Sequence, residues 1–474
     1  MSMNPDAYSA RHYSGGGPGG SGASGTALDR RVGSARHAAQ PQVRGEVDGV
    51  VGLSVSVRGV AARLGELICI GPAGTPARAA SVGDATHPPL LAEVVALDGD
   101  RLTCLPLGPL DGIGIGSPVM ATGGPLEIAV GAGLRGRVVD GLGRIMDSGP
   151  PLSGCERVAV DLAPPHALAR TRVDEPMSLG VRALDTLVPC GRGQRVGIFS
   201  GSGVGKSSLL SMITRGSDAA VNVVALVGER GREVREFLDN DLGPQGLARS
   251  VVVVATSDQP ALVRLRACFV ATRIAEWFRD RGDHVLLLMD SLTRAAMAQR
   301  EVGLSAGEPP ATRGYPPSVF AMMPRLLERA GPGSIGSITG LYTVLVEGDN
   351  HNEPIADAAR SILDGHVVLD RRLATAGHFP SIDVLDSVSR VAGAVTTPEQ
   401  RAWATELRRL LAAHREVREL IEIGAYAPGS NLDADRARAL MPRIEEFLCQ
   451  DLNESSTPEQ AWGALFHLLK EVQT

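Results

Sequence analysis

The sequence reads Ser200-Gly201-Ser202-Gly203-Val204-Gly205-Lys206-Ser207-Ser208 directly after the apolar run 196–199 and before the apolar positions Leu209, Leu210 and Ile213. This order predicts a strand, a glycine-rich loop and the start of a helix. Such a loop turns successive backbone N–H groups inward around phosphate, and the helix that follows points the positive end of its dipole at the same place. Ser200 stands where the usual pattern begins with glycine, which leaves Gly201, Gly203 and Gly205 to make the bend. The stretch therefore indicates a binding loop for a nucleoside triphosphate.

Two side chains of this loop have specific roles in that prediction. Lys206 supplies a cation to the β- and γ-phosphate oxygens, and the Ser207 hydroxyl can coordinate Mg²⁺. The residues expected to contact the nucleotide are Gly201, Ser202, Gly203, Val204, Gly205, Lys206, Ser207 and Ser208. A glycine-rich turn before an ordinary helix could have the same sequence, so the rest of the chain must decide between the two interpretations.

The composition is that of a large globular protein without a nucleic-acid signature. A length of 474 residues suggests about three domains. Aromatic residues make up only 3% of the chain and the net charge is −6, which argues against a protein that reads nucleic acid. The six scattered cysteines form no C-x-x-C pair and are expected to be reduced core residues. No apolar run approaches the roughly 18 residues of a membrane span, so a cytoplasmic protein is expected.

Changes in composition divide the chain into four parts. Residues 1–40 are rich in glycine and small residues, which predicts a disordered tail. Residues 41–125 contain short alternating runs such as Leu53-Ser54-Val55-Ser56-Val57 and predict a small β-barrel or sandwich. The turn-rich text from Leu134 to Pro151 is interpreted as a connector into a central domain, which spans 126–392. Residues 393–474 predict a helical domain.

The central domain combines buried strands with helical patterns. Residues 221–227, 250–255 and 285–289 are almost entirely apolar, as expected of parallel strands covered on both faces. Residues 260–281 carry apolar side chains at helical spacing and predict a crossover helix. Thr397-Pro398-Glu399-Gln400 is a helix-start signature whose text recurs at 457–460. The expected fold class is α/β, with a β-domain before the sheet and helices after it.

Carboxylates follow two of the predicted strands. Glu229 lies in the charged text 228–234, and Asp290 ends the apolar run that begins at His284. Ligands of open α/β sheets bind beyond the carboxyl ends of the strands. There Glu229 can orient and polarise a water that attacks the γ-phosphate, and Asp290 can hold the hydration shell of Mg²⁺ beside Ser207. Without the phosphate loop, Glu229 would be interpreted as part of a solvated loop and Asp290 as a helix cap. Together with the phosphate loop, the two carboxylates predict ATP hydrolysis.

Four longer stretches resemble the type III export ATPases, a family related to the catalytic subunit of rotary ATP synthases. The stretches are 228–234, 288–294, 361–369 and Gly307-Glu308-Pro309-Pro310-Ala311-Thr312-Arg313-Gly314-Tyr315-Pro316-Pro317-Ser318-Val319-Phe320. The resemblance covers residues 45 to 470. It implies an N-terminal β-barrel, a central RecA-like P-loop ATPase domain and a C-terminal helical domain, assembled into a homohexameric ring.

The resemblance also implies roles for individual residues. Lys206, Glu229, Arg230 and Asp290 match catalytic or phosphate-proximal positions, and Ser207 and Asp290 match the Mg²⁺ positions. Arg390 matches an arginine that the neighbouring subunit supplies, and such a finger is worth about 10³ to 10⁵ in rate.

Two aromatic residues are candidates for the adenine. Phe379 stands where the related ATP synthase subunit has an adenine-stacking tyrosine, and either ring offers an apolar face to the base. Tyr426 is a second candidate, and a packing aromatic is its alternative.

Within the family, the sequence favours the flagellar branch over the virulence injectisome branch. The stretches that carry this preference are 255–262, 295–300 and 368–373. The implied function is ATP hydrolysis coupled to chaperone release and to unfolding and export of substrates. The implied partners are a stator or regulator protein, export-gate membrane proteins and chaperone–substrate complexes, with no nucleic acid. The implied location is the cytoplasmic face of the inner membrane, peripheral to it and not inserted.

Three other interpretations share the same core. A rotary ATP synthase or vacuolar-type subunit would use the same catalytic residues, but the text 307–317 favours export. An RNA translocase of the transcription-terminator kind is also RecA-like, but the acidic chain and the aromatic-poor β-domain argue against it. A non-catalytic ring subunit usually lacks an essential residue, whereas Lys206, Glu229, Asp290 and Arg390 are all present.

Overall fold

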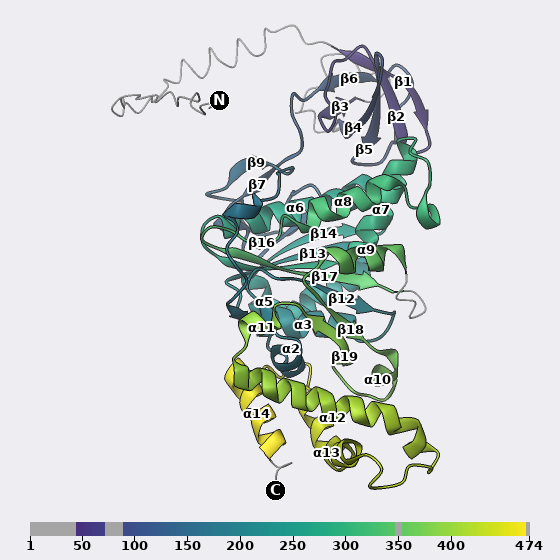
Figure 1. The fold of residues 1–474 in the computed structure, drawn as a ribbon. Helices are drawn as coiled ribbons and strands as arrows, with labels where there is room; N and C mark the ends of the chain where they lie inside the picture. Colours follow the sequence, from purple (N-terminus) through teal and green to yellow (C-terminus); the bar gives the residue numbers. More distant parts are fainter. Residues whose placement is uncertain (1–43, 72–88, 347–352, 471–474) are drawn as a thin grey trace, which may run out of the picture. The chain divides into compact units, whose positions relative to one another are not determined.

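The computed structural model describes residues 44–71, 89–346 and 353–470 (Figure 1). The tail predicted for residues 1–40 lies outside the described residues. In the described ranges, no helix is long and apolar enough to cross a lipid bilayer. All six cysteines fall within these ranges and are unpaired; four are buried, whereas Cys155 and Cys449 are half-buried. The expectation of reduced cysteines in the core therefore applies to four of the six.

The first part of the described chain is a closed β-barrel, which decides between the barrel and the sandwich left open by the sequence. Its side chains alternate between the two faces of the wall: Val55 and Val57 are fully buried, whereas Ser54 and Ser56 are partly exposed. The strands pair in the order β1-β2-β5-β4-β3-β6. Their bounds are β1 Gly45–Val51, β2 Ser54–Arg58, β3 Leu67–Ile70, β4 Leu90–Asp98, β5 Arg101–Pro106 and β6 Pro118–Ala121.

The centre of the molecule is a nine-stranded sheet in the order β19-β18-β12-β17-β15-β13-β14-β8, with β16 paired to β17. The strands from β18 to β8 run parallel, and β19 is an antiparallel edge strand. Their bounds are β8 Arg137–Asp140, β12 Arg195–Ser200, β13 Val221–Glu229, β14 Ser250–Thr256, β15 His284–Asp290, β16 Gly331–Pro332, β17 Ser337–Leu345, β18 Gly365–Leu369 and β19 Ile382–Ser389. The three strands predicted from their apolar runs are confirmed as β13, β14 and β15.

One expectation about this sheet was wrong. The text between Leu134 and Pro151 is not only a connector, because β8 within it pairs with β14. Val138 and Val139 are buried there, and this two-valine run is too short to give a strand signature among its glycines. Two small antiparallel pairs also lie outside the main sheet: β7 Glu127–Val130 with β9 Glu156–Ala159, and β10 Pro176–Met177 with β11 Cys190–Gly191.

Helices cover both faces of the sheet, as Figure 1 shows. Side chains of β13 alternate between two cores: Val223, Ala225 and Val227 join the core with α6, whereas Val224 and Leu226 join the core with α3. The predicted crossover helix 260–281 is confirmed as α6. The α-helices of the central region are α2 Arg182–Leu187, α3 Lys206–Gly216, α4 Gly231–Glu236, α5 Gly243–Ala248, α6 Ala261–Arg279, α7 Leu292–Ser305, α8 Pro317–Leu327, α9 Pro354–Ile362, α10 Arg371–Thr375 and α11 Ala392–Val395. Short 3-10 turns are η1 Ala132–Leu134, η2 Ala167–Ala169 and η4 Thr312–Gly314, and η3 Phe237–Leu242 is a π-helix.

Three further helices close the chain: α12 Pro398–Glu422, α13 Leu432–Leu448 and α14 Pro458–Lys470. Their apolar faces, which include Leu407, Phe447 and Leu465, join the same core as β12 and α3. The helices therefore share a core with the side of the sheet that carries the phosphate loop. The repeated Thr-Pro-Glu-Gln text begins α12 and α14 in the same way, with reciprocal side-chain and backbone hydrogen bonds at both starts.

The start of α12 provides a test of this capping. Thr397→Ala removes the hydroxyl that accepts the N–H of Gln400, and we expect a loss of about 1 kcal/mol in the free energy of unfolding. Denaturant unfolding of the purified chain measures the loss. Thr397→Ser keeps the hydroxyl and should unfold near wild type. Equal losses in the two variants would contradict a capping role.

Candidate active site

The predicted phosphate loop joins the end of β12 to the start of α3. Gly203 and Gly205 have φ angles of 73° and 88°, in the left-handed region that side chains with a Cβ rarely adopt. The buried Ser381 hydroxyl donates to the carbonyl oxygen of Val204 over 2.5 Å. Ser207 follows Lys206 on the exposed first turn of α3. The loop therefore has the backbone conformation that a phosphate site needs. The hydrogen bond from Ser381, which is distant in the sequence, stabilises that conformation.

Lys206 lies between the two predicted carboxylates. Its Nζ is 2.5 Å from Asp290 Oδ1 and 3.7 Å from Glu229 Oε1. The Thr343 hydroxyl of β17 also donates to Asp290 Oδ1, over 2.7 Å. The three charged side chains are between 8% and 15% exposed, so water screens their attraction only weakly. Because β13 and β15 are parallel neighbours, the two acids that end them meet at the same edge of the sheet.

Glu229 holds a proton more tightly than an ordinary glutamate. Burial is the main reason, and the negative charge of Asp290 and a hydrogen bond with Glu233 act in the same direction. Together they raise the pKa of Glu229 to about 7, although the nearby Lys206 ammonium opposes the change. The same hydrogen bond lowers the pKa of Glu233. Glu229 therefore takes up a proton near neutral pH, whereas Glu233 stays ionised to lower pH.

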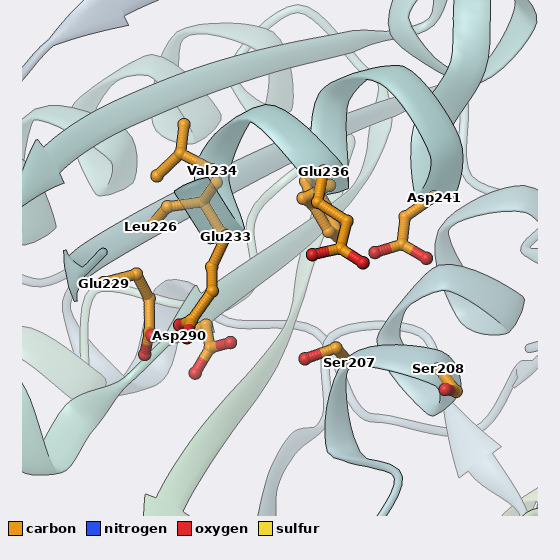
Figure 2. Close-up of a pocket in the computed structure, with 10 residues that line it drawn as sticks. Ser207, Ser208, Leu226, Glu229, Glu233, Val234, Glu236, Asp241 and Asp290 are labelled. Carbon is orange, nitrogen blue, oxygen red and sulfur yellow. The ribbon is translucent and has the colours of Figure 1, made fainter. Parts of the chain in front are cut away.

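A cavity of about 300 Å³ opens beside these groups (Figure 2). Figure 2 shows the carboxylates of Glu229, Glu233 and Asp290 grouped on one side, with the Ser207 hydroxyl across from them. The lining residues are Ser207, Ser208, Leu226, Glu229, Glu233, Val234, Glu236, Phe237, Asp241 and Asp290. Among the residues that the structure describes, no three acidic, His or Cys side chains converge closely enough to hold a metal ion alone. The residues present suit Mg²⁺ that arrives with a nucleotide, because this ion usually takes one or two carboxylates together with substrate phosphates and water.

Two of the predicted arginines lie outside this cavity lining. The Arg230 side chain is 78% exposed and pairs with Glu233 over 3.0 Å. Arg390 follows β19, is exposed, and donates from Nη2 to the Arg360 carbonyl oxygen over 3.2 Å. An arginine in that position is available to another molecule, and its predicted role stays a prediction for the assembled protein.

The two predicted adenine-stacking rings lie in different surroundings. Phe379 is 44% exposed and packs beside the phosphate loop, because a Cβ placed on Gly205 would lie 3.2 Å from its ring. Tyr426 packs against Val417 and its neighbours between α12 and α13, and its hydroxyl donates to the Asp435 carboxylate over 3.0 Å. The contacts of Phe379 fit the stacking prediction, whereas those of Tyr426 fit the packing alternative.

Sequence reasoning missed three side chains of the site. Glu233 had a signal, since it stands four residues after Glu229 in the same charged text. Thr343 had none, because it lies inside an apolar strand. Arg294 lies in the first turn of α7 and packs along Gly228, and its buried Nε has no hydrogen-bond partner within the described part of the chain. Ser200 likewise has a buried hydroxyl without a partner among the described residues.

The carboxyl pair gives a prediction about pH. From the predicted role of Glu229 as the group that polarises water, we expect kcat/KM for ATP hydrolysis to rise with pH through about 7, because that role requires the ionised carboxylate. A pH profile of the purified enzyme measures this limb. Glu233→Gln should move the limb to lower pH, since an amide N–H stabilises the Glu229 carboxylate where Glu233 stabilised its protonated form. An unmoved limb in Glu233→Gln would assign the titration to another group, such as the nucleotide.

Two curated relatives and one solved structure match nearly the whole chain. A "Flagellum-specific ATP synthase" of Bacillus subtilis is 48% identical over 424 residues, which covers 90% of this chain and 94% of the relative. An "SPI-2 type 3 secretion system ATPase" of Salmonella typhimurium is 49% identical over 408 residues, covering 86% and 90%. The assembled ATPase EscN of enteropathogenic E. coli, in complex with its central stalk EscO, superimposes with a TM-score of 0.80 at 44% identity and covers 90% of this chain and 100% of that chain.

The parallel sheet, the phosphate loop and the acids that end β13 and β15 define a P-loop ATPase. Residues 180–389 match the nucleotide-binding domain of the ATP synthase alpha/beta family, and residues 396–467 match the T3SS EscN ATPase C-terminal domain. The chain belongs to the family of type III secretion and flagellum-specific ATPases, as its longer motifs predicted. It is therefore an enzyme that hydrolyses ATP.

Proposed function

We propose that this enzyme is the ATPase of a flagellar protein export apparatus, where ATP hydrolysis drives chaperone release and the unfolding and export of substrates. The observation that carries the proposal is 48% identity across 94% of a flagellum-specific ATP synthase. The virulence injectisome is the alternative, because a secretion-system ATPase is as similar.

Deletion of the gene in its own host tests the choice between the two machines. Loss of motility and of flagellin in the medium, restored by the wild-type gene, is the expected result. Intact motility with loss of another secreted protein would assign the chain to an injectisome. Strong stimulation of ATP hydrolysis by RNA, with steep salt dependence, would contradict both export functions.

The proposed roles of the site residues follow from its charges. Lys206 pairs with Asp290 and lies near Glu229, and in this proposal it contacts the β- and γ-phosphates when ATP enters the loop. Ser207 and Asp290 are the residues that would hold Mg²⁺, which neutralises the charge of the phosphates when bound. Glu229 positions the attacking water, and its hydrogen bond to Glu233 offers a second carboxylate for the proton. Arg230, which follows Glu229, is proposed as a phosphate-proximal arginine, and Phe379 is proposed to stack on adenine.

The assembly is proposed to be a homohexameric ring. EscN has been seen assembled and in complex with its central stalk EscO, and 90% of this chain superimposes on it with a TM-score of 0.80. In such a ring Arg390 of one subunit would complete the ATP site of the next. The partners proposed here are a stator or regulator protein, chaperone–substrate complexes and export-gate membrane proteins, which the enzyme would meet at the cytoplasmic face of the inner membrane.

A further inference from the structure

The carboxylate of Asp364 binds the first residue of the strand that leads to the phosphate loop. Its Oδ2 accepts from the backbone N–H and the Nε of Arg195, and Oδ1 accepts from Nη2, over 3.0 to 3.2 Å. The backbone N–H of Asp364 donates to the Arg195 carbonyl oxygen over 2.8 Å. Arg195 begins β12, and the loop begins where β12 ends. Asp364 therefore holds the entry of the loop strand from both its backbone and its side chain.

The carbonyl oxygen of the same Asp364 holds Arg390. It accepts the backbone N–H of Arg390 over 3.0 Å and the Nε2 of Gln194 over 3.0 Å. Gln194 immediately precedes β12, is fully buried, and donates a second bond to the hydroxyl of Ser389 over 3.2 Å. Packing here is close, because a Cβ on Gly365 would lie 2.6 Å from the Val388 carbonyl oxygen. The main chain of Arg390 is thus fixed to the start of β12 through Asp364 and Gln194.

A second connection joins the Arg390 guanidinium to the other end of β12. It donates to the carbonyl oxygen of Arg360 in α9, and the Arg360 guanidinium lies 4.7 Å from the centroid of the Phe199 ring. Phe199 is fully buried and stands two residues before Gly201. Both the backbone and the side chain of Arg390 are therefore connected, through intervening contacts, to the strand that carries the phosphate loop of the same subunit.

We propose that Asp364, assisted by Gln194, is a positioning residue that couples the phosphate loop of one subunit to the Arg390 that the same subunit presents to its neighbour. The coupling rests on the trans role given to Arg390 in the proposed function. In a ring, a displacement of β12 when ATP enters one site then moves the arginine that serves the next site. Strand β12, Asp364 and Gln194 would then physically connect one ATP site of the ring to the next.

The alternative is that Asp364 only stabilises the fold of its own subunit. Arg195 has a second acid, since its Nη1 lies 2.5 Å from Glu328 Oε1. Loss of the Asp364 charge therefore leaves the buried guanidinium with a partner, and Asp364→Asn is expected to fold. Mixed rings separate the two roles, because positioning acts on the neighbouring site and a fold defect acts on the subunit's own loop.

The experiment compares full-length Asp364→Asn alone and mixed with Lys206→Ala, in rings captured through two different tags. Alone, Asp364→Asn should lower kcat by about 10- to 100-fold with KM little changed, because a misplaced catalytic group costs this much while the loop remains intact. Binding of a fluorescent ATP analogue to the unassembled variant should match wild type. In mixed rings, about a quarter of the interfaces combine the intact loop of an Asp364→Asn subunit with the correctly held arginine of a Lys206→Ala subunit. The activity of mixed rings should therefore exceed the sum of the activities of the two homogeneous rings.

Three results would overturn the coupling: wild-type kcat in Asp364→Asn, weakened binding of the analogue, or no gain in mixed rings. The absence of a gain in mixed rings is compared with a reference experiment, in which Arg390→Ala is mixed with Lys206→Ala. If that pair gains activity and the Asp364→Asn pair does not, the coupling is wrong and the trans arginine stands. If neither pair gains, the trans role itself fails. Gln194→Met serves as a second variant with the same expected pattern, and the exposed Asp111→Asn in the barrel loop is the matched control, which should behave as wild type.

Discussion

Lys206→Ala is expected to lower ATP hydrolysis by at least about 10³-fold and to weaken nucleotide binding with it. The Lys206 ammonium faces two acids, Asp290 at 2.5 Å and Glu229 at 3.7 Å. Its removal leaves the carboxylates of Asp290, Glu229 and Glu233 beside the loop without the lysine that faces the first two, so a triphosphate would meet uncompensated negative charge there. Steady-state hydrolysis and binding of a fluorescent ATP analogue measure the two losses.

Lys206→Arg sharpens this test. Lys206 and Lys470 are the only lysines in the sequence, and all the other residues among its 47 lysines and arginines are arginine. An ammonium is a compact point charge on a flexible stem, whereas a guanidinium is a wide planar fork that cannot turn within the same loop. We therefore expect Lys206→Arg to remain inactive although its charge is kept.

The controls for this test come from the same chain. Lys470→Ala removes the other lysine, which lies over the Phe466 ring in α14, and should hydrolyse ATP as wild type does. Glu229→Gln should lose turnover but keep nucleotide binding, because it removes the carboxylate that orients water and leaves the loop cation in place. Wild-type turnover in Lys206→Arg would show that charge alone is sufficient at this position.

The parts of this site that sequence could predict are those encoded by local patterns. The phosphate loop, the three buried strands and the acids at the ends of β13 and β15 each occupy one short stretch, and parallel strands bring their carboxyl ends together. The capping text at Thr397 is equally local. Side chains that reach the site across the sheet carry no such pattern: Thr343 is one hydroxyl inside an apolar strand, and Ser381 supports Val204 from 177 positions away.

The opposite pKa shifts of Glu229 and Glu233 also could not be predicted from the sequence alone. Glu229 ends β13 and Glu233 lies in the first turn of α4, so the sequence places them near each other, but their pKa values depend on burial and on neighbouring charges such as Asp290. The β8 strand was missed for a related reason, since a two-valine run among glycines becomes a strand only because β14 offers it an edge. Tertiary surroundings decide both cases.

Arg390→Ala is expected to bind ATP with near wild-type affinity and to lower kcat by about 10³- to 10⁵-fold. Its guanidinium is exposed and lies outside the lining of its own cavity, so its loss should leave Lys206, Glu229 and Asp290 undisturbed within the subunit. The loss appears only in the ring, where no neighbour then supplies positive charge to the transferring phosphoryl group. Analogue binding to the unassembled variant and turnover of the assembled ring measure the two parts of this expectation.

Mixing decides whether Arg390 acts on its own site or on the next one. Rings that contain Arg390→Ala and Lys206→Ala subunits include interfaces where the first supplies the loop and the second the arginine, and these interfaces should hydrolyse ATP although neither parent does. Arg372→Ala is the matched control, because this exposed arginine pairs with Asp370 inside its own subunit and should leave turnover near wild type. Confirmed mixed rings that stay as inactive as their parents would place the effect of Arg390 within its own subunit, and the ATP site would then be complete in a single chain.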